Sequence, residues 1–312
     1  MQISTAQLFQ NAYGTFAVGA FNIFTMEQVL GLFKGADKAA APIIVAMTPV
    51  ARRYASPVML AAMVKAASEL YPNVVYAVHL DHGNTEHCSD AIDSGHYNSV
   101  MIDASFEPLE KNIAITSEIS DKAHTAGMQV EAELGVLSGI EDDKNISNKQ
   151  ALYTNPEQAL EFVQKTQCDS LAVAVGTSHG AYKFSGGTGL QLDILQQISQ
   201  KLPRFPLVLH GASAVPHDEI ERINAAGGAL KSSAQGTNPD ELKRAISFGV
   251  CKINIATDAR LIWTRVHREF FRESPDKFDP ILPGQHYIND YAEFVAAKCQ
   301  LLGSSDKAKL FK

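Results

Sequence analysis

The sequence is poor in cysteine and contains no long apolar run. Its 312 residues include four cysteines, Cys88, Cys168, Cys251 and Cys299, which stand singly along the chain. This spacing excludes a disulfide framework and the paired thiolates of a structural zinc site, so we expect reduced and mostly buried thiols. The longest apolar stretch, residues 39–51, is interrupted by two prolines and is too short to span a bilayer.

Positive charge is scarce as well. The 27 Lys and Arg residues are outnumbered by 34 Asp and Glu residues, which gives a formal net charge of −7. Without a basic run, neither a nucleic acid nor an anionic membrane is expected as a partner, and an anionic substrate must be bound by local donors. Residues 1–21 lack the basic segment and the cleavage site of a secretory signal, so we expect a cytoplasmic protein.

The composition itself, with 46% hydrophobic and 20% charged residues, is that of a globular protein. Short apolar runs alternate with longer helical patterns, which indicates repeated βα units and a parallel sheet. Eight such runs cover residues 17–22, 43–47, 74–79, 99–103, 129–133, 170–175, 207–210 and 251–255. Most of them are continuously apolar, as expected for strands that helices cover on both faces.

Eight strands that are each followed by a helix favour an α/β fold, a closed (β/α)8 TIM barrel that forms one domain over residues 1–312. An additional helix is expected over residues 288–302. An open doubly wound sheet is the alternative, but its edge strands would be apolar and poorly protected. Long connections over residues 138–152, 182–190 and 224–239 are expected to be functional or mobile.

Polar residues at the ends of the strands are the strongest functional signal. In a barrel the carboxyl ends of all strands meet at one mouth, where active sites are built. The polar positions there are His79, Asp81, His82, Asp103, Glu131, Glu133, His179, His210 and Asn254.

Three of these residues, His82, His179 and His210, can place imidazoles around one ion and leave a position open, which is the usual arrangement of a catalytic zinc site. Each histidine taken alone is equally well explained as a hydrogen-bonded residue of the core or mouth. Strand alternation predicts that His79 points elsewhere.

The acidic residues at the mouth have two interpretations each. Alternation turns Asp81 away from the neighbouring His82, so Asp81 is either a proton donor that faces the substrate or a partner that orients a histidine. Asp103 and Glu133 form either an additional acidic metal position or ordinary mouth carboxylates.

Two turns after neighbouring strands are candidates for binding an anion. Residues 210–213 and 254–257 each follow a strand and lead toward a helix, so that backbone N–H groups and the Ser213 hydroxyl can hold a phosphate. Lys183, in the glycine-rich connection, can add positive charge.

Five motifs occur in order along the chain: HLDHG (79–83), VEAELG (130–135), GTSHGAYK (176–183), LHGAS (209–213) and KINIATD (252–258). In these motifs, and over nearly its whole length, the sequence resembles the class II, metal-dependent ketose-bisphosphate aldolases. The resemblance implies that His82, His179 and His210 hold a catalytic Zn²⁺. It also implies that Asp103 and Glu133 contribute a second or alternate divalent position, and that some neighbouring positions bind a monovalent cation.

The resemblance further implies two acid–base residues, Asp81 on the C4 hydroxyl side of the substrate and Glu141 at the dihydroxyacetone phosphate carbon. Taken from the sequence alone, Glu141 would be a solvated loop charge. The substrate-binding positions that it implies are Asn22, Thr48, Gly180, Lys183, Gly211, Ala212, Ser213, Asn254, Ile255, Ala256, Thr257 and Arg260.

The function implied is zinc-dependent, reversible cleavage of fructose 1,6-bisphosphate in glycolysis and gluconeogenesis, by a homodimer or homotetramer. Ala256 stands where many fructose-bisphosphate members have Asp, and Ile281-Leu282 where an Arg-Lys pair is common. Tagatose 1,6-bisphosphate or another phosphorylated ketose is therefore the alternative substrate, and Arg52 or Arg53 the alternative to Arg260 at the distal phosphate. An alternative of another class is a metal-dependent barrel hydrolase, in which the metal activates water.

Overall fold

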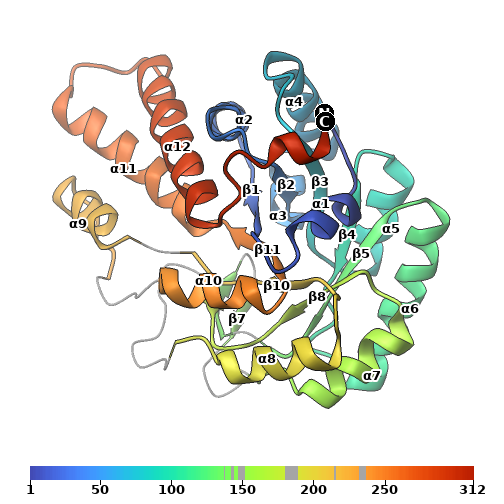
Figure 1. The fold of residues 1–312 in the computed structure, drawn as a ribbon. Coiled ribbons are helices and arrows are strands. Elements are labelled where there is room, and N and C mark those ends of the chain that lie inside the picture. The colour runs from blue at the N-terminus through green and yellow to red at the C-terminus, as the bar shows by residue number, and fades with distance from the viewer. Residues whose placement is uncertain (137, 142–143, 147–151, 180–188, 214–215, 232–236) are drawn as a thin grey trace.

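The computed structural model describes all residues except 137, 142–143, 147–151, 180–188, 214–215 and 232–236 (Figure 1). Eight parallel strands close into a barrel in the order β1-β11-β10-β8-β5-β4-β3-β2. Their bounds are β1 Val18–Asn22, β2 Ile43–Met47, β3 Tyr76–Gly83, β4 Ser99–Ile102, β5 Gln129–Leu134, β8 Ser170–Val173, β10 Leu207–Leu209 and β11 Val250–Ile255. The predicted barrel and all eight predicted strands are confirmed, with ends that differ by at most four residues.

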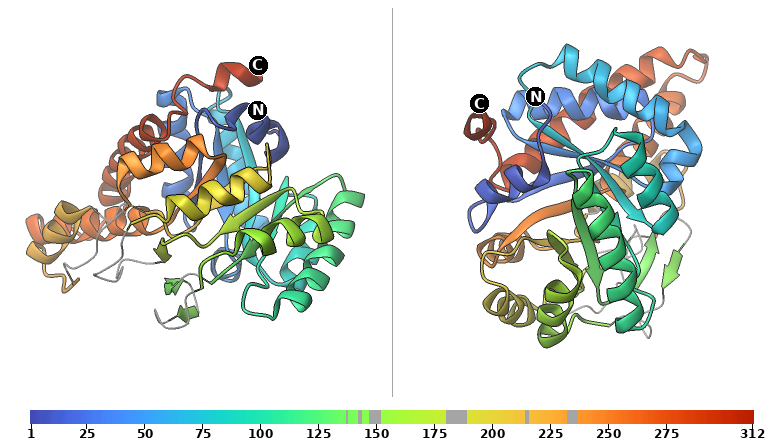
Figure 2. Two further views of the ribbon diagram at one scale, coloured as in Figure 1. Left: turned by 60° about the horizontal axis from the view of Figure 1, so that its bottom comes forward. Right: turned by 90° about the vertical axis from the view of Figure 1, so that its right-hand side faces the viewer.

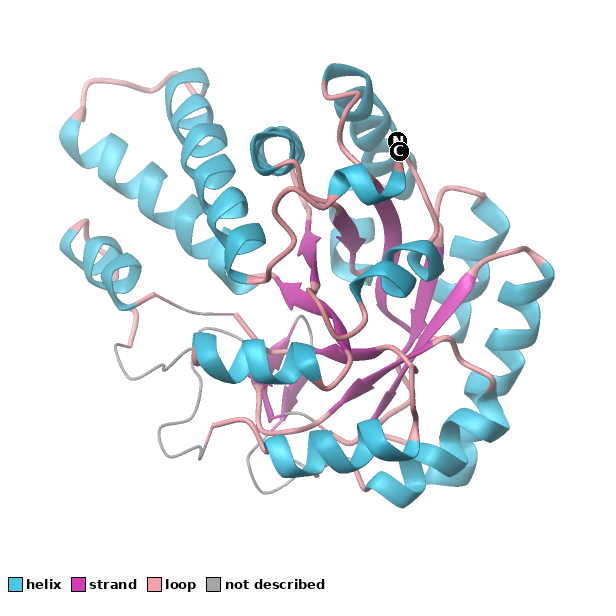
Figure 3. Cartoon of the chain, viewed as in Figure 1, coloured by secondary structure: helices cyan, strands magenta, loops and turns pink. Residues whose placement is uncertain are grey.

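Helices surround the strands on the outside of the barrel (Figure 3). Their bounds are α1 Thr5–Ala12, α2 Met26–Ala39, α3 Pro49–Ala55, α4 Pro57–Leu70, α5 Thr85–Ser94, α6 Leu109–Thr125, α7 Pro156–Thr166, α8 Leu192–Lys201, α9 His217–Ala225, α10 Pro239–Ser247, α11 Thr257–Glu273, α12 Ile281–Leu301 and the 3₁₀ turn η1 Ala308–Phe311. The termini lie side by side (Figure 2).

Local sequence explains where the helices begin and end. The Asn155 side chain accepts hydrogen bonds from the backbone of Glu157 and Gln158, and Pro156 takes the first helical position of α7. Gly95 ends α5 in the left-handed conformation, with a φ of 67°. The additional C-terminal helix is longer than predicted, because Pro283 lies in its first turn, where a missing N–H costs nothing.

The segment predicted as a long polar connection contains strands, which corrects that interpretation. β6 Ser138–Glu141 pairs antiparallel with β7 Lys144–Ile146 and parallel with β9 Ser178–His179. This three-stranded sheet lies outside the barrel (Figure 2). Its short, polar strands lack the apolar pattern by which a strand is recognised in a sequence.

The barrel interior is layered because successive inward side chains are two residues apart along each strand. Ala20, Ala46 and Ala77 belong to a buried apolar cluster that α1 closes with Leu8 and Phe9. One step higher lie the polar side chains of His79, Glu131 and Lys252, all at most 2% exposed. The next layer, with Asp81, His210 and Asn254, forms the floor of the mouth.

The larger apolar core fills the space between the strands and the helices around them. All four cysteines are buried and free, as predicted. Among the described residues, no helix is long and apolar enough to cross a membrane.

Candidate functional site

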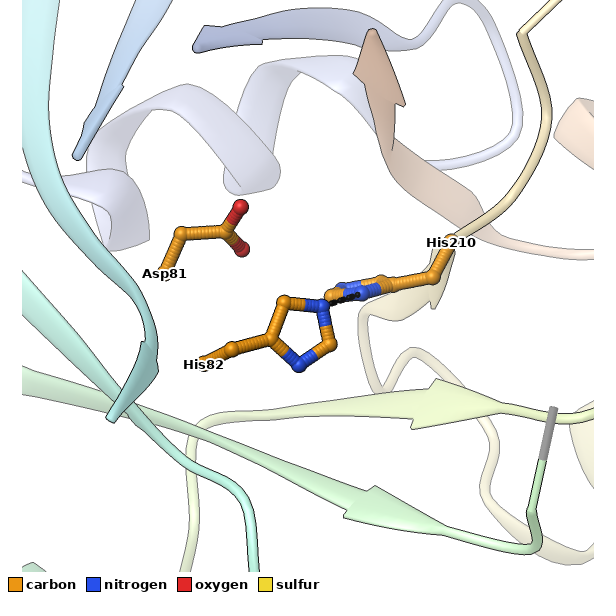
Figure 4. A group of neighbouring side chains, drawn as sticks. All are labelled: Asp81, His82 and His210. Carbon is orange, nitrogen blue, oxygen red and sulfur yellow. Dashed lines mark hydrogen bonds between the residues drawn. The ribbon is translucent and has the colours of Figure 1, made fainter. Parts of the chain in front are cut away.

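The end of β3 brings two neighbouring side chains to the same space, which contradicts the predicted alternation. His82 has a φ of 52°, in the left-handed region, and the pairing of β3 with β4 shifts register between Leu80 and Gly83. This irregularity interrupts the two-residue period. As a result, Asp81, His82 and His210 have potential metal-binding atoms within 4.8 Å of one another (Figure 4).

The rings of His82 and His210 face each other through nitrogen atoms. His82 Nε2 lies 2.8 Å from His210 Nδ1, and the ring planes are nearly perpendicular, at 87°. Two nitrogen lone pairs at this distance repel unless a proton or a cation lies between them. The pair is therefore suited to share a positively charged partner.

The outward nitrogens of both rings are bound to carboxylates. His210 Nε2 lies 2.9 Å from Glu131 Oε1, and His82 Nδ1 lies 3.2 Å from Asp103 Oδ2 and 3.6 Å from Glu133 Oε2. A carboxylate at one nitrogen holds the proton there and leaves the other nitrogen free to bind a metal, as at known histidine metal sites. The residues present thus fit a metal ion between His82 and His210.

A second group of potential ligands consists of His82, Asp103 and Glu133. It uses the outward nitrogen of His82, which the carboxylates already contact. The His82 ring cannot bind one ion through Nε2, on the side of His210, and a second ion through Nδ1 unless it also loses the Nδ1 proton. The geometry therefore makes Asp103 and Glu133 either orienting partners or members of an alternate position.

Asp81 is fully buried and held by two amides. Asn22 Nδ2 donates to Asp81 Oδ2 and Asn254 Nδ2 donates to Asp81 Oδ1, both at 2.9 Å. Burial raises the pKa of the Asp81 carboxyl, but the surrounding charges, those of His82 and Lys252 first among them, together outweigh burial, so the net shift is downward. Among the described residues, Asn22 Oδ1 and Asn254 Oδ1 are buried without a hydrogen-bond partner, and both remain available to a ligand hydroxyl.

Lys252 lies beneath His210 and was not predicted as a site residue. Its Nζ donates to both oxygens of Glu131 at 2.8 Å and lies 3.3 Å from His79 Nε2. Burial and the charge of Lys252 lower the pKa of His79 to about 3, so His79 is neutral, and its Nδ1 pairs with Ser99 Oγ at 2.8 Å. The one available signal was a lysine within the apolar run of β11, two residues before Asn254.

His179 and Glu141 are placed by their backbones only. The small sheet pairs Gly139 of β6 with His179 of β9, and Glu141 follows two residues later along β6. The backbone therefore brings the segment that carries Glu141 beside the segment that carries His179. Gly180 and Lys183 lie outside the described residues.

The two candidate anion-binding turns lie after neighbouring strands, because β10 pairs with β11. Gly211 has a φ of 63°, and Ala212 and Ser213 are buried. Beside them, Ile255 ends β11 and α11 begins at Thr257, where Ala256 provides no side-chain cap.

Three cationic or polar candidates lie around this mouth. The guanidinium of Arg260 lies 4.9 Å from the centre of the Phe24 ring, and the Thr48 hydroxyl accepts a hydrogen bond from the backbone of Ala51 at the start of α3. Arg52, an alternative candidate for the distal phosphate, does not lie on the surface. It is buried, forms an ion pair with Asp90 and donates to the backbone oxygen of His87.

Comparison with known proteins gives a consistent assignment. The family model described as "Fructose-bisphosphate aldolase class-II" matches residues 3–307. A fructose-bisphosphate aldolase of Giardia intestinalis is 42% identical over 95% of this chain and 91% of its own, and one of Thermus caldophilus is 41% identical over 94% and 95%. The crystal structure of the YdjI aldolase from Escherichia coli K12 superposes with a TM-score of 0.78 at 28% identity, covering 99% of this chain and all of that one.

Proposed function

This chain belongs to the class II fructose-bisphosphate aldolase family of lyases, and we propose that it cleaves fructose 1,6-bisphosphate reversibly to dihydroxyacetone phosphate and glyceraldehyde 3-phosphate. The observation that carries the proposal is the pair of facing nitrogens on His82 and His210, each ring anchored by a carboxylate. Members of this family depend on a metal ion. The barrel hydrolase, which was the alternative of another class, has no support from the family match.

We propose zinc as the metal, with His82, His179 and His210 as its ligands. When bound, zinc supplies a Lewis acid that stabilises the negative charge developing on the substrate oxygens. The carboxylates of Glu131 and Asp103 orient His210 and His82. Asp103 and Glu133 with His82 form the alternate divalent position.

Asp81 acts on the C4 hydroxyl of the ketose. During cleavage this hydroxyl loses its proton while the bond between C3 and C4 breaks, so a base must accept the proton. The downward pKa shift keeps the Asp81 carboxylate ionised and two amides fix its position, so it carries no proton and can accept one. In the condensation direction Asp81 returns the same proton as an acid.

Glu141 is the proposed acid–base group at the other fragment. After the bond breaks, the carbon that was C3 of the ketose takes up a proton to give dihydroxyacetone phosphate, and Glu141 donates it. Support comes from the backbone of β6, which pairs with β9 beside the proposed ligand His179.

The proposed phosphate sites use donors at the mouth. Backbone groups of residues 211–213 and 254–257, with Gly180 and Lys183, bind the 1-phosphate, and part of this loop set holds the monovalent cation. Asn22 and Asn254 present unpartnered oxygens to substrate hydroxyls, and Thr48 lies at the rim. Arg260, exposed on the first turn of α11, is the proposed contact of the distal phosphate.

Cleavage assays with fructose 1,6-bisphosphate and tagatose 1,6-bisphosphate test this function. Each sugar is offered to the purified protein as isolated, after chelation, and after Zn²⁺ is restored. We expect zinc-restored release of triose phosphate, faster from fructose 1,6-bisphosphate. Faster release from tagatose 1,6-bisphosphate, the substrate that Ala256 favours, would make that sugar the proposed substrate in place of fructose 1,6-bisphosphate. Release from neither would contradict the proposed bisphosphate substrates.

We also propose that the protein is a cytoplasmic homodimer or homotetramer. The turn between α11 and α12 lies at the outer edge of the molecule (Figure 1) and exposes Phe278 and Ile281 by 92% and 71%. Phe271 and Leu282 nearby are 40% and 50% exposed. Sedimentation of the wild type and of Phe278→Asp tests the assembly, and we expect the variant to shift toward the monomer.

A further inference from the structure

The polar layer beneath the mouth forms a continuous chain of hydrogen bonds that ends at His210. Ser99 pairs with His79, His79 lies against Lys252, Lys252 donates to Glu131, and Glu131 pairs with His210. The first four side chains come from four different strands and His210 directly follows a fifth, β10; each of the five is at most 3% exposed. Burying so many polar groups is costly unless every one of them is satisfied.

All three donors of the Lys252 ammonium have acceptors. Two go to the Glu131 oxygens at 2.8 Å and the third to the neutral His79 ring at 3.3 Å. With no lone pair free and no exposed surface, Lys252 is not arranged to attack a substrate carbonyl. Its contacts instead fix the plane and the charge of the Glu131 carboxylate, which can then only accept a hydrogen bond from His210.

We propose that Lys252 is a positioning residue of the metal centre, which keeps His210 in the tautomer whose Nδ1 carries no proton and faces His82. The inference rests on the proposed metal site. Without the ammonium, the Glu131 carboxylate loses the two hydrogen bonds that fix its plane beside His210 Nε2. It then no longer holds the His210 proton on Nε2, and the tautomer with Nδ1–H cannot bind a metal through Nδ1.

The test uses Lys252→Met in the full-length protein, with two readouts that do not depend on turnover. Zn²⁺ affinity is measured by competition with a fluorescent chelator, and the tautomer of His210 is read from ¹⁵N chemical shifts of the metal-free protein. We expect zinc affinity to fall by about 10- to 100-fold. The His210 signals should change from one tautomer with Nε2–H to a mixture.

Two further variants separate positioning from stability. Lys298 is also a largely buried lysine beside a buried carboxylate, and its Nζ lies 3.4 Å from Asp258 Oδ2. Its side chain, however, lies in the layer of helices around the barrel. Lys298→Met should therefore leave zinc affinity and the His210 tautomer unchanged. The double variant Glu131→Gln/Lys252→Met removes both buried charges, so it should regain melting temperature over Lys252→Met yet keep the reduced zinc affinity, because an amide does not select a tautomer either.

The outcomes distinguish this inference from the proposed function. The positioning role would be overturned if Lys252→Met had the zinc affinity and the His210 tautomer of the wild type. If that variant does not fold, the same result in the double variant would overturn it. A wild type that binds no zinc would instead overturn the proposed metal site. In that case the ¹⁵N measurement still decides whether Lys252 sets the tautomer of His210.

Discussion

Lys252 inside the barrel and Arg265 among the outer helices are both buried cations held by carboxylates. Lys252 is fully buried and pairs with Glu131, which in turn contacts His210. Arg265, with a side chain 6% exposed, pairs with Glu219 of α9, Glu269 of α11 and Asp290 of α12. The first network ends at a side chain that faces the mouth, whereas the second joins three helices.

The difference shows that similar ion pairs serve different purposes according to what their carboxylates contact. The partners of Arg265 are 15% to 44% exposed, so water shares in their solvation and the network acts as a clamp between helices. Glu131 is 2% exposed and has no such access to water. Changes inside the barrel should therefore affect metal binding and rate, and changes in the helical layer should affect stability alone.

The largest effects are expected at the mouth. His210→Ala should abolish zinc binding and activity together, because it removes a proposed ligand. Asp81→Ala should retain zinc and lose about 10²- to 10⁴-fold in kcat, the usual contribution of one acid–base group. Metal content by atomic absorption and kcat for fructose 1,6-bisphosphate check both. Equal loss of metal in the two variants would contradict the separation of their roles.

Breaking the outer clamp is the next largest change. Arg265→Met removes the cation that three carboxylates share, although Glu269 keeps its second partner, Arg222. We expect a loss of about 3 kcal/mol in the free energy of unfolding, at the low end for a broken buried pair because the carboxylates are partly solvated. Urea unfolding measures this loss, and chelator competition should show unchanged zinc affinity. A lower zinc affinity in this variant would contradict the expectation that Arg265, unlike Lys252, affects stability alone.

Acid should affect the barrel network through His79. Its pKa is about 3 in the folded protein against 6.5 for an unperturbed histidine, so between these values the unfolded chain binds a proton that the folded protein does not. This contribution to stability is complete above pH 6.5 and falls by roughly 1.4 kcal/mol per pH unit below it. Urea unfolding at pH 7 and pH 5 should show a smaller loss for His79→Gln than for the wild type. An identical pH dependence would show that His79 does not titrate in this way.

The smallest effect is expected at a close contact between the backbones of two helices, α2 and α12. A Cβ at Gly35 of α2 would lie 2.5 Å from the backbone oxygen of Ala292 and 2.7 Å from Val295 Cβ in α12. Gly35→Ala should therefore destabilise the fold by about 1–3 kcal/mol, as overpacking does, with zinc affinity unchanged. A melting temperature equal to that of the wild type would mean that α12 can move away at no cost.

Elements with a strong local pattern were predictable, and those that depend on distant partners were not. The eight barrel strands were found because most of them are continuously apolar, and the caps that bound α5 and α7 are equally local features. The strands of the small sheet were missed, since their polar residues pair only with one another and with β9. Asp81 was recognised as an acid–base candidate, but its direction was wrong because the left-handed His82 interrupts the strand.

By itself the sequence determined the (β/α)8 architecture and the chemical types at the mouth, because apolar period, caps and residue identity are local properties. Only the tertiary structure decided which nitrogen of each histidine faces the site. That choice depends on Glu131, which lies 79 residues from His210, and on Lys252, which lies 121 residues from Glu131. No local pattern encodes such a contact, because barrel closure brings these strands together and burial makes each of their hydrogen bonds obligatory.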